Sequence, residues 1–286
     1  MFYITSIADG VIQLAGLFLP QETFAPRLLK DRARKLRQKT GNEAYHTEYD
    51  GEKTGAKLMI AVLRPFRLLG TQPIVQMLAL YMAYIYGIMY LTLSTFPTLW
   101  SGPDYYHESV GIGSLNYISL GLGFVIGSQI PAQVNDRVYL TLKKAANGNG
   151  RPEFRVPPMM IGALFVPCGL FLYGWSAQAQ THWIVPNVGA AIFAAGNVMA
   201  FQGIQVYVVD AYSRYAASAM AAVSVLRSLT GMTFPLFAPY LFAKLHYGWG
   251  NSLLAFISIG IGFPAPIVLW YYGEALRKRS PFAAGD

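Results

Sequence analysis

The sequence predicts an all-α membrane protein, a polytopic transmembrane helical bundle, and three observations support this fold class. Hydrophobic residues make up 54% of the 286 residues and charged residues only 13%, whereas soluble domains carry roughly 25% charged residues. Long stretches such as 68–103 and 156–209 contain no charged residue. Apolar residues also run continuously and do not alternate as they do in a membrane β-barrel. This composition excludes a disordered chain, a basic nucleic-acid-binding domain and an ordinary cytosolic enzyme.

We expect seven spans, because a helix needs about 20 mostly apolar residues to cross a bilayer. The first is Phe2–Pro20, which contains Asp9 and lacks the basic leader and small-residue cleavage site of a signal peptide. The other six are Ile74–Phe96, Gly113–Gln133, Val156–Trp175, Trp183–Val209, Tyr215–Phe242 and Leu253–Tyr272. The chain therefore divides into a first span (1–20), a cytosolic central loop (21–73), a six-span half (74–273) and a cytosolic tail (274–286).

The basic residues predict the orientation of these spans. Twenty of the 22 Lys and Arg residues lie in 21–73, 134–155, 210–214 and 274–286, which share one side of a seven-span model. Of the remaining two, Lys244 lies on the opposite side and Arg227 within a span. Because cytosolic loops are enriched in Lys and Arg, the N-terminus is expected outside and the C-terminus in the cytosol. The net charge of +8 thus reflects topology, and no nucleic-acid partner is expected.

Four tryptophans fall at the outer ends of the predicted spans. They are Trp100, Trp175, Trp183 and Trp249. Tryptophan is enriched where a membrane meets water, so these residues predict an interfacial belt.

Several strings in the sequence resemble one family. They are Glu22–Pro26, Thr40–Asn42, Arg151–Arg155, Val209–Tyr212, Leu226–Ser228 and Gly231–Phe237. Together they closely resemble the central loop, the loop after the eighth span and the eleventh span of fungal drug:proton antiporters. These antiporters form a twelve-span branch of the major facilitator superfamily.

This resemblance implies a function and a missing part. Members of the family use inward proton flow to export drugs, toxins or secondary metabolites and confer multidrug resistance, which implies a plasma-membrane efflux pump without a cofactor. Phe2–Pro20 then corresponds to the sixth span, so we expect only the C-terminal portion of the fold. The expected partners are the lipid bilayer, a small-molecule substrate, protons, and a missing N-terminal half or a full-length transporter. The alternative is a truncated, non-transporting seven-helix fragment that acts as a partner or is a relic.

Arg227 is the first candidate for a substrate-binding residue. It lies roughly 20 Å into its predicted span at 1.5 Å per residue, where an arginine costs about 2.5–3.5 kcal/mol. It therefore either serves a substrate anion or proton coupling, or is satisfied structurally by carbonyl groups or a carboxylate. Asp9 lies at a similar depth, so the two side chains are possible partners.

Polar residues in the spans outline a weakly polar substrate pocket. The candidates are Tyr81, Tyr84, Tyr90, Gln129, Asn197 and Gln202. Transporter sites combine aromatic walls with few polar groups, but each of these residues also suits interhelical hydrogen bonding. Gly121, Gly123 and Gly127 predict a close approach between helices.

Proton coupling or gating has four candidates, Asp210, Asp136, Arg137 and Asp9. Asp210 is either a proton carrier or a cap on the following helix. Asp136 and Arg137 resemble the Asp-Arg loop motif of the superfamily and predict an ion pair beside a gate.

The sequence contains no pattern of a catalytic or metal site. His46, His107, His182 and His246 lie far apart, without the spacing of metal ligands. The single cysteine, Cys168, excludes a disulfide framework and is expected in the core. We therefore expect neither an enzyme nor a bound metal. A retinal protein fits poorly because the last span lacks a lysine, and a seven-helix receptor fits poorly because the long cytosolic segment 21–73 follows the first span.

Overall fold

The computed structural model describes residues 2–18, 25–42, 44–47 and 54–283. Pro20 and residues 22–24, on which two of the sequence predictions fall, lie outside them. The chain divides into two compact units, Met1–Ile60 and Ala61–Asp286. This boundary lies within the predicted central loop 21–73, whose role as a separate cytosolic part stays a prediction.

The first unit contains two complete helices. They are α1 (Phe2–Phe18), which is apolar, and α2 (Ala25–Thr40), which is strongly basic. A third helix, α3 (Thr54–Thr71), begins in this unit and continues into the second. Within α1, the exposed Asp9 accepts a hydrogen bond from Gln13 at 2.9 Å.

The second unit is a bundle of long helices. In chain order they are α4 (Pro73–Ser101), α5 (Val110–Leu115), α6 (Tyr117–Ala145), η1 (Pro152–Arg155), α7 (Pro157–Gln178), α8 (Ile184–Ala211), η2 (Ser213–Tyr215), α9 (Ala216–Gly262) and α10 (Pro264–Lys278). Proline opens α4, α7 and α10, where its fixed φ angle favours the first helical turn. No strand occurs in the described ranges, which confirms the all-α prediction.

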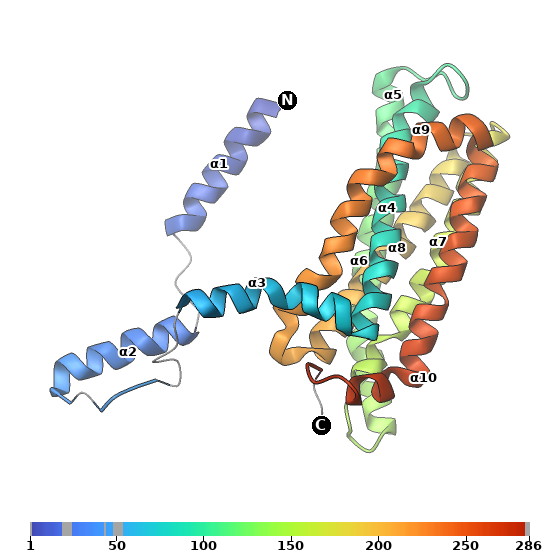
Figure 1. Cartoon of the computed structure of the whole chain (residues 1–286). Coiled ribbons are helices and arrows are strands. Elements are labelled where there is room, and N and C mark those ends of the chain that lie inside the picture. Colours follow the sequence, from blue (N-terminus) through green and yellow to red (C-terminus); the bar gives the residue numbers. More distant parts are fainter. Residues whose placement is uncertain (1, 19–24, 43, 48–53, 284–286) are drawn as a thin grey trace. The chain divides into compact units, whose positions relative to one another are not determined.

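Helix α9 covers one predicted span, Tyr215–Phe242, and the first half of the last one. Its 47 residues would reach about 70 Å if straight, more than twice the roughly 30 Å hydrocarbon thickness of a bilayer. At His246 the backbone leaves the helical conformation, with φ 54° and ψ 179°. Figure 1 shows the chain reverse its direction within α9. The last predicted span, Leu253–Tyr272, is therefore the end of α9 and the start of α10, joined at Phe263.

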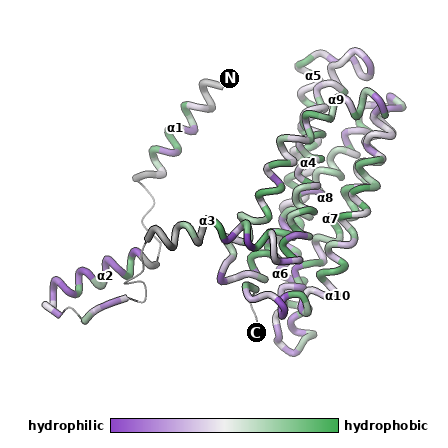
Figure 2. Tube along the Cα trace, viewed as in Figure 1, coloured by the Kyte–Doolittle hydropathy of each residue, from purple (hydrophilic) through white to green (hydrophobic). Residues whose placement is uncertain are grey.

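Five helical stretches in the described part are long and apolar enough to cross a membrane. They are Pro73–Ser101, Val110–Ala145, Pro152–Gln178, Ile184–Ala211 and Ser213–Lys278. The fifth has 66 residues and contains the reversal, so it accounts for the last two predicted spans. Figure 2 shows the apolar character of these helices and the polar character of α2. Helix α1, with 17 residues, is shorter than these stretches, and its crossing of a membrane stays a prediction.

Glycines bring α8 close to its neighbours. A Cβ atom added to Gly169 of α7 would lie 2.3 Å from the backbone nitrogen of Phe193. Gly123 and Gly127 of α6 similarly contact the backbone of α8, which confirms the predicted close approach, whereas Gly121 faces open space. Helix α8 is thus fixed between α6 and α7 by direct backbone packing.

Two sequence predictions about the surface were wrong. Trp100 is fully buried and packs against Phe96 and Tyr106, so it belongs to the core and not to an interfacial belt. The other three tryptophans are at least 43% exposed, as a belt requires. Cys168 is exposed and not in the core, because it lies on the face of α7 that turns away from the bundle.

Candidate functional site

Three helices meet around Arg227. Its guanidinium carbon lies 4.5 Å from the ring centre of Tyr86 in α4 and 5.9 Å from that of Phe201 in α8. The two rings stack at 6.4 Å with an interplanar angle of 27°. Arg227 is partly buried, and its side chain therefore lies against aromatic faces that carry a negative quadrupole.

Hydrogen bonds between helices fix this arrangement. Thr230 of α9 donates to the carbonyl of Ala83 at 2.6 Å, which ties α9 to α4 one turn from Arg227. Asn197 of α8 donates to the carbonyl of Ile85 at 2.6 Å. The hydroxyls of Tyr86 and Tyr90 lie 3.2 Å apart and share a hydrogen bond. Both ring-bearing helices are thus held in register beside Arg227.

No carboxylate in the described part of the second unit neutralises the charge of Arg227. Its buried Nε atom has no hydrogen-bond partner there. Within the second unit as described, Arg227 therefore has neither of the structural partners predicted from sequence, a carboxylate or a carbonyl group. Stacking on rings stabilises the cation by about 0.5–2 kcal/mol. The remaining donors are suited to an anionic or hydrogen-bond-accepting molecule that stacks on the same rings.

The predicted pocket residues do not gather around Arg227. Tyr81 is fully buried in the core, and Tyr84 donates to the carbonyl of Leu254. Asn197 is buried as the interhelical link described above. Tyr90 is the member of the predicted set that reaches the site, through Tyr86. A substrate role for the others stays a prediction.

The two predicted glutamines lie on other surfaces. Gln129 is exposed on α6. Gln202 lines a cavity of about 340 Å³ between α6 and α8, together with Asn135, Asp136 and Arg155. This cavity opens toward the basic end of the bundle.

Arg155 joins two of the predicted gating residues. It is the last residue of η1 and donates to Asp136 of α6 at 2.6 Å and to Asp210 of α8 at 3.1 Å. Its guanidinium also lies 4.3 Å from the Tyr139 ring. Asp136 of the Asp-Arg motif thus forms its ion pair with Arg155, while Arg137 is exposed, and the gating role of the motif stays a prediction. Asp210 does not cap the following helix.

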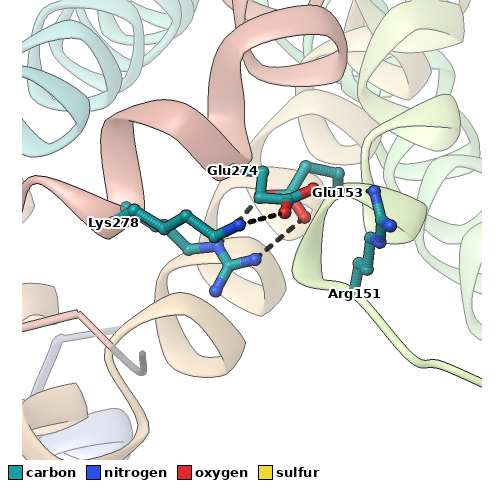
Figure 3. Close-up of polar contacts among 5 residues, drawn as sticks. Arg151, Glu153, Glu274 and Lys278 are labelled. Carbon is teal, nitrogen blue, oxygen red and sulfur yellow. Dashed lines mark hydrogen bonds and ion pairs between the residues drawn. The ribbon is translucent and has the colours of Figure 1, made fainter. Parts of the chain in front are cut away.

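A buried ion pair lies beside this cluster. Arg277 of α10 donates to both carboxylate oxygens of Glu153 in η1, at 3.0 and 3.3 Å, and both side chains are at most 7% exposed. Around it, Glu274 pairs at 2.7 Å with Arg151 and with Lys278, both exposed (Figure 3). Segments 134–155, 210–214 and 274–279, placed on one side from sequence, therefore meet at one end of the bundle.

Sequence reasoning does not single out Tyr86, Phe201, Glu153 or Arg277. The spacing of Tyr86 and Tyr90, four residues apart on one helix face, is the signal that identifies the ring beside Arg227. Asp9 belongs to the first unit, and its predicted pairing with Arg227 stays a prediction. Among the residues described, no group of three His, Cys, Asp or Glu side chains is arranged to hold a metal.

Comparisons with known proteins identify relatives of the chain. It is 49% identical over its full length to "Efflux pump vrtL" of Penicillium aethiopicum and covers 56% of that protein. It is 43% identical over 93% of its length to "MFS-type transporter oryF" of Aspergillus oryzae and covers 55% of it. "Probable efflux pump mfs2" of Aspergillus flavus is 41% identical over 98% of the chain, which covers 66% of it.

The chain thus spans about half the length of the curated relatives it matches. No family model and no solved structure matches it. The matches are consistent with the C-terminal portion of such proteins.

Proposed function

Since the chain belongs to the major facilitator superfamily of membrane transporters, we propose that it carries out proton-driven efflux of a small organic molecule. The names of its relatives, which include efflux pumps, support this proposal. So does its nature as an integral membrane protein with charge-poor helices. The relatives are transporters, and the proposed activity involves no enzymatic step.

The arginine beside two stacked rings carries the proposal. Arg227 lies about 17 Å from the start of α9, counted at 1.5 Å per residue, which is close to the middle of a bilayer. A molecule there gains ring stacking from Tyr86 and Phe201 and electrostatic attraction from the guanidinium. We therefore propose that the substrate is a neutral or anionic compound with an aromatic ring, and that cationic compounds are disfavoured.

We propose that the protein lies in the plasma membrane and that the ion-pair end of the bundle faces the cytosol. The basic segments that meet there support this orientation through the enrichment of Lys and Arg in cytosolic loops. It puts the N-terminus outside and the C-terminus inside. Asp136 and Asp210, held by one arginine, are the proposed gating groups. We further propose that protons drive transport and that a partner supplies a second half-bundle. Transporters of this kind work by rocking two halves around a midplane site.

A pair of dyes tests the proposed site. Fluorescein and rhodamine 123 share a xanthene ring system but differ in charge, the first an anion and the second a cation at neutral pH. The full chain in lipid nanodiscs is titrated with each dye, and binding is followed by fluorescence polarisation. We expect fluorescein to bind more tightly than rhodamine 123. Arg227→Ala should raise the Kd for fluorescein about 5- to 30-fold, which corresponds to the loss of roughly 1–2 kcal/mol.

Lys244→Ala is the matched control, because Lys244 is an exposed cation on the same helix. It should leave both affinities unchanged. Equal loss in both variants would mean that net charge, and not the ring-bound arginine, governs binding. A preference for rhodamine 123 that survives Arg227→Ala would overturn the proposal.

A further inference from the structure

An apolar cavity lies between α5, α6 and α8, away from the Arg227 site. Its volume is about 510 Å³, within the range of about 300–1,000 Å³ that is usual for small-molecule sites. Leu115, Ile118 and Leu122 form one wall, and Val188 and Ala191 of α8 form the other. Four of these residues are 47–62% exposed: Leu115, Ile118, Leu122 and Val188. The cavity is therefore open along an apolar surface that a bilayer would cover.

One end of this cavity is polar. Asn187 of α8, Asn116 at the junction of α5 and α6, and Glu108 line it together. Asn187 donates from Nδ2 to Oδ1 of Asn116 at 2.6 Å, and Asn116 donates from Nδ2 to the Glu108 carboxylate at 2.7 Å. These bonds form a chain that runs toward the carboxylate.

The direction of the chain is fixed by its ends. An ionised carboxylate offers acceptors and no donor, so Asn116 must present its NH₂ group to Glu108 and its oxygen to Asn187. The Nδ2 atom of Asn187 donates a second bond to the carbonyl of Trp183 at 3.0 Å. Both hydrogens of that amide are therefore committed, and Oδ1 is left as an acceptor at the inner end of the chain.

That acceptor has no donor among the residues described. Asn187 is only 7% exposed, and its Oδ1 atom is buried without a hydrogen-bond partner. Buried amide oxygens are nearly always bonded, and leaving one unpaired is costly. A molecule that fits here needs an apolar body for the walls and a hydrogen-bond donor at one end. A ketone or ester oxygen in that place would face another acceptor.

The cavity lies at the end of the bundle opposite the ion-pair network. Trp183, half exposed, stands at its polar end, where tryptophan marks the border of a membrane with water. The apolar walls continue from this border toward the middle of the helices. A lipid of that leaflet, with its hydroxyl at the border and its body toward the membrane centre, has the matching order of groups.

We propose that this cavity binds a hydroxyl-bearing amphipathic molecule of sterol size, which enters sideways from the bilayer and donates its hydroxyl to Asn187. The shared chemistry, one hydroxyl on an apolar body, also fits a transported compound that has reached this leaflet. The site is separate from the Arg227 site.

Photolabelling of the full chain tests this proposal. The chain is placed in nanodiscs that contain a diazirine-bearing 3β-hydroxysterol, irradiated, and mapped by mass spectrometry. We expect label on the peptides that carry Leu122 and Val188. Val188→Trp, which fills the cavity from an exposed position, should lower this label at least about 5-fold. Ile130→Trp, on an equally exposed position of α6 that does not line the cavity, should not.

Competition identifies the hydrogen bond. An unlabelled 3β-hydroxysterol should compete about 5-fold better than its 3-keto analogue, the ratio expected for one unmade hydrogen bond. Asn187→Leu should abolish this difference. Label spread over all apolar faces and insensitive to Val188→Trp, or equal competition by the ketone in the unaltered chain, would overturn the proposal.

The source of the ligand follows from one more variant. Label that is unchanged in Arg227→Ala assigns the site to a bilayer lipid, and label that is lost there assigns it to a molecule on the transport route. Both results retain the cavity as a hydroxyl-binding site.

Discussion

Glutamine in place of Glu153 should destabilise the second unit severely. The carboxylate of Glu153 receives two hydrogen bonds from Arg277, and both side chains are almost completely buried. Glu153→Gln keeps the shape but removes the carboxylate charge from a buried ion pair, and breaking such a pair costs about 3–5 kcal/mol. For a unit of this size, about 2–4 °C in Tm per kcal/mol gives a fall of roughly 6–20 °C.

Thermal unfolding of the full chain in detergent, followed by the helical circular dichroism signal, measures this effect. Glu274→Gln is the matched control, since Glu274 belongs to the same cluster but pairs with exposed Arg151 and Lys278. Water screens those pairs, so the control should leave Tm nearly unchanged. The double variant Glu153→Leu, Arg277→Met should recover most of the lost Tm, because an apolar pair replaces a buried ion pair at little cost.

Two results would refute this reasoning. A Glu153→Gln protein as stable as Glu274→Gln would mean that the buried pair contributes no more than an exposed one. A double variant no more stable than Glu153→Gln alone would mean that the fall in Tm does not come from breaking the Glu153–Arg277 ion pair.

Three further changes test the packing, the reversal and the surroundings of Arg227. Gly169→Ala should destabilise the chain by about 1–3 kcal/mol because the added methyl group forces α7 away from α8. Gly121→Ala, whose added methyl group meets no atom within 4 Å, should not lower Tm, and equal Tm values in the two variants would contradict the close contact of Gly169 with α8. His246→Gly should raise Tm, since φ 54° with ψ 179° suits glycine and costs other residues about 1–3 kcal/mol; a lower Tm would show that the histidine side chain outweighs this strain. In a background without the native cysteine, Tyr90→Cys should react several-fold faster with an anionic than with a cationic methanethiosulfonate reagent, and Arg227→Ala should remove that preference. A preference that persists in Arg227→Ala would show that this arginine does not cause it.

The sequence identifies the membrane-spanning helices well because the bilayer imposes a simple rule. Stretches without charge mark the spans, and the distribution of Lys and Arg sorts the loops into two groups. The structure has helices over the six predicted spans of the second unit, although Gly113–Gln133 is divided between α5 and α6 and Leu253–Tyr272 between α9 and α10. It also brings 134–155, 210–214 and 274–279 to one end. The reversal at His246 falls between the predicted spans Tyr215–Phe242 and Leu253–Tyr272, where the backbone departs from a helix at this single residue.

Side-chain neighbours were harder to predict. Helices α7, α8 and α9 are apolar on nearly all sides, so periodicity does not show which face of each helix turns inward. Tyr81 and Tyr90 of the apolar helix α4 likewise look alike in the sequence, yet the first is fully buried in the core and the second is exposed beside Tyr86. Arg155 pairs with Asp136 and Asp210 although these residues lie on different helices, a contact that depends on how the helices are assembled.

The most direct test of the central claim, that Arg227 faces the transport route of a proton-driven exporter, is dye flux across a membrane. The full chain is reconstituted, together with the partner half-bundle that the proposal requires, in liposomes with fluorescein; a pH gradient is imposed, and flux is followed with and without a protonophore. The account predicts flux that depends on the gradient, is lost in Arg227→Ala and is retained in Lys244→Ala. Gradient-driven flux that persists at the same rate in Arg227→Ala, or no flux by the unaltered chain, would contradict it.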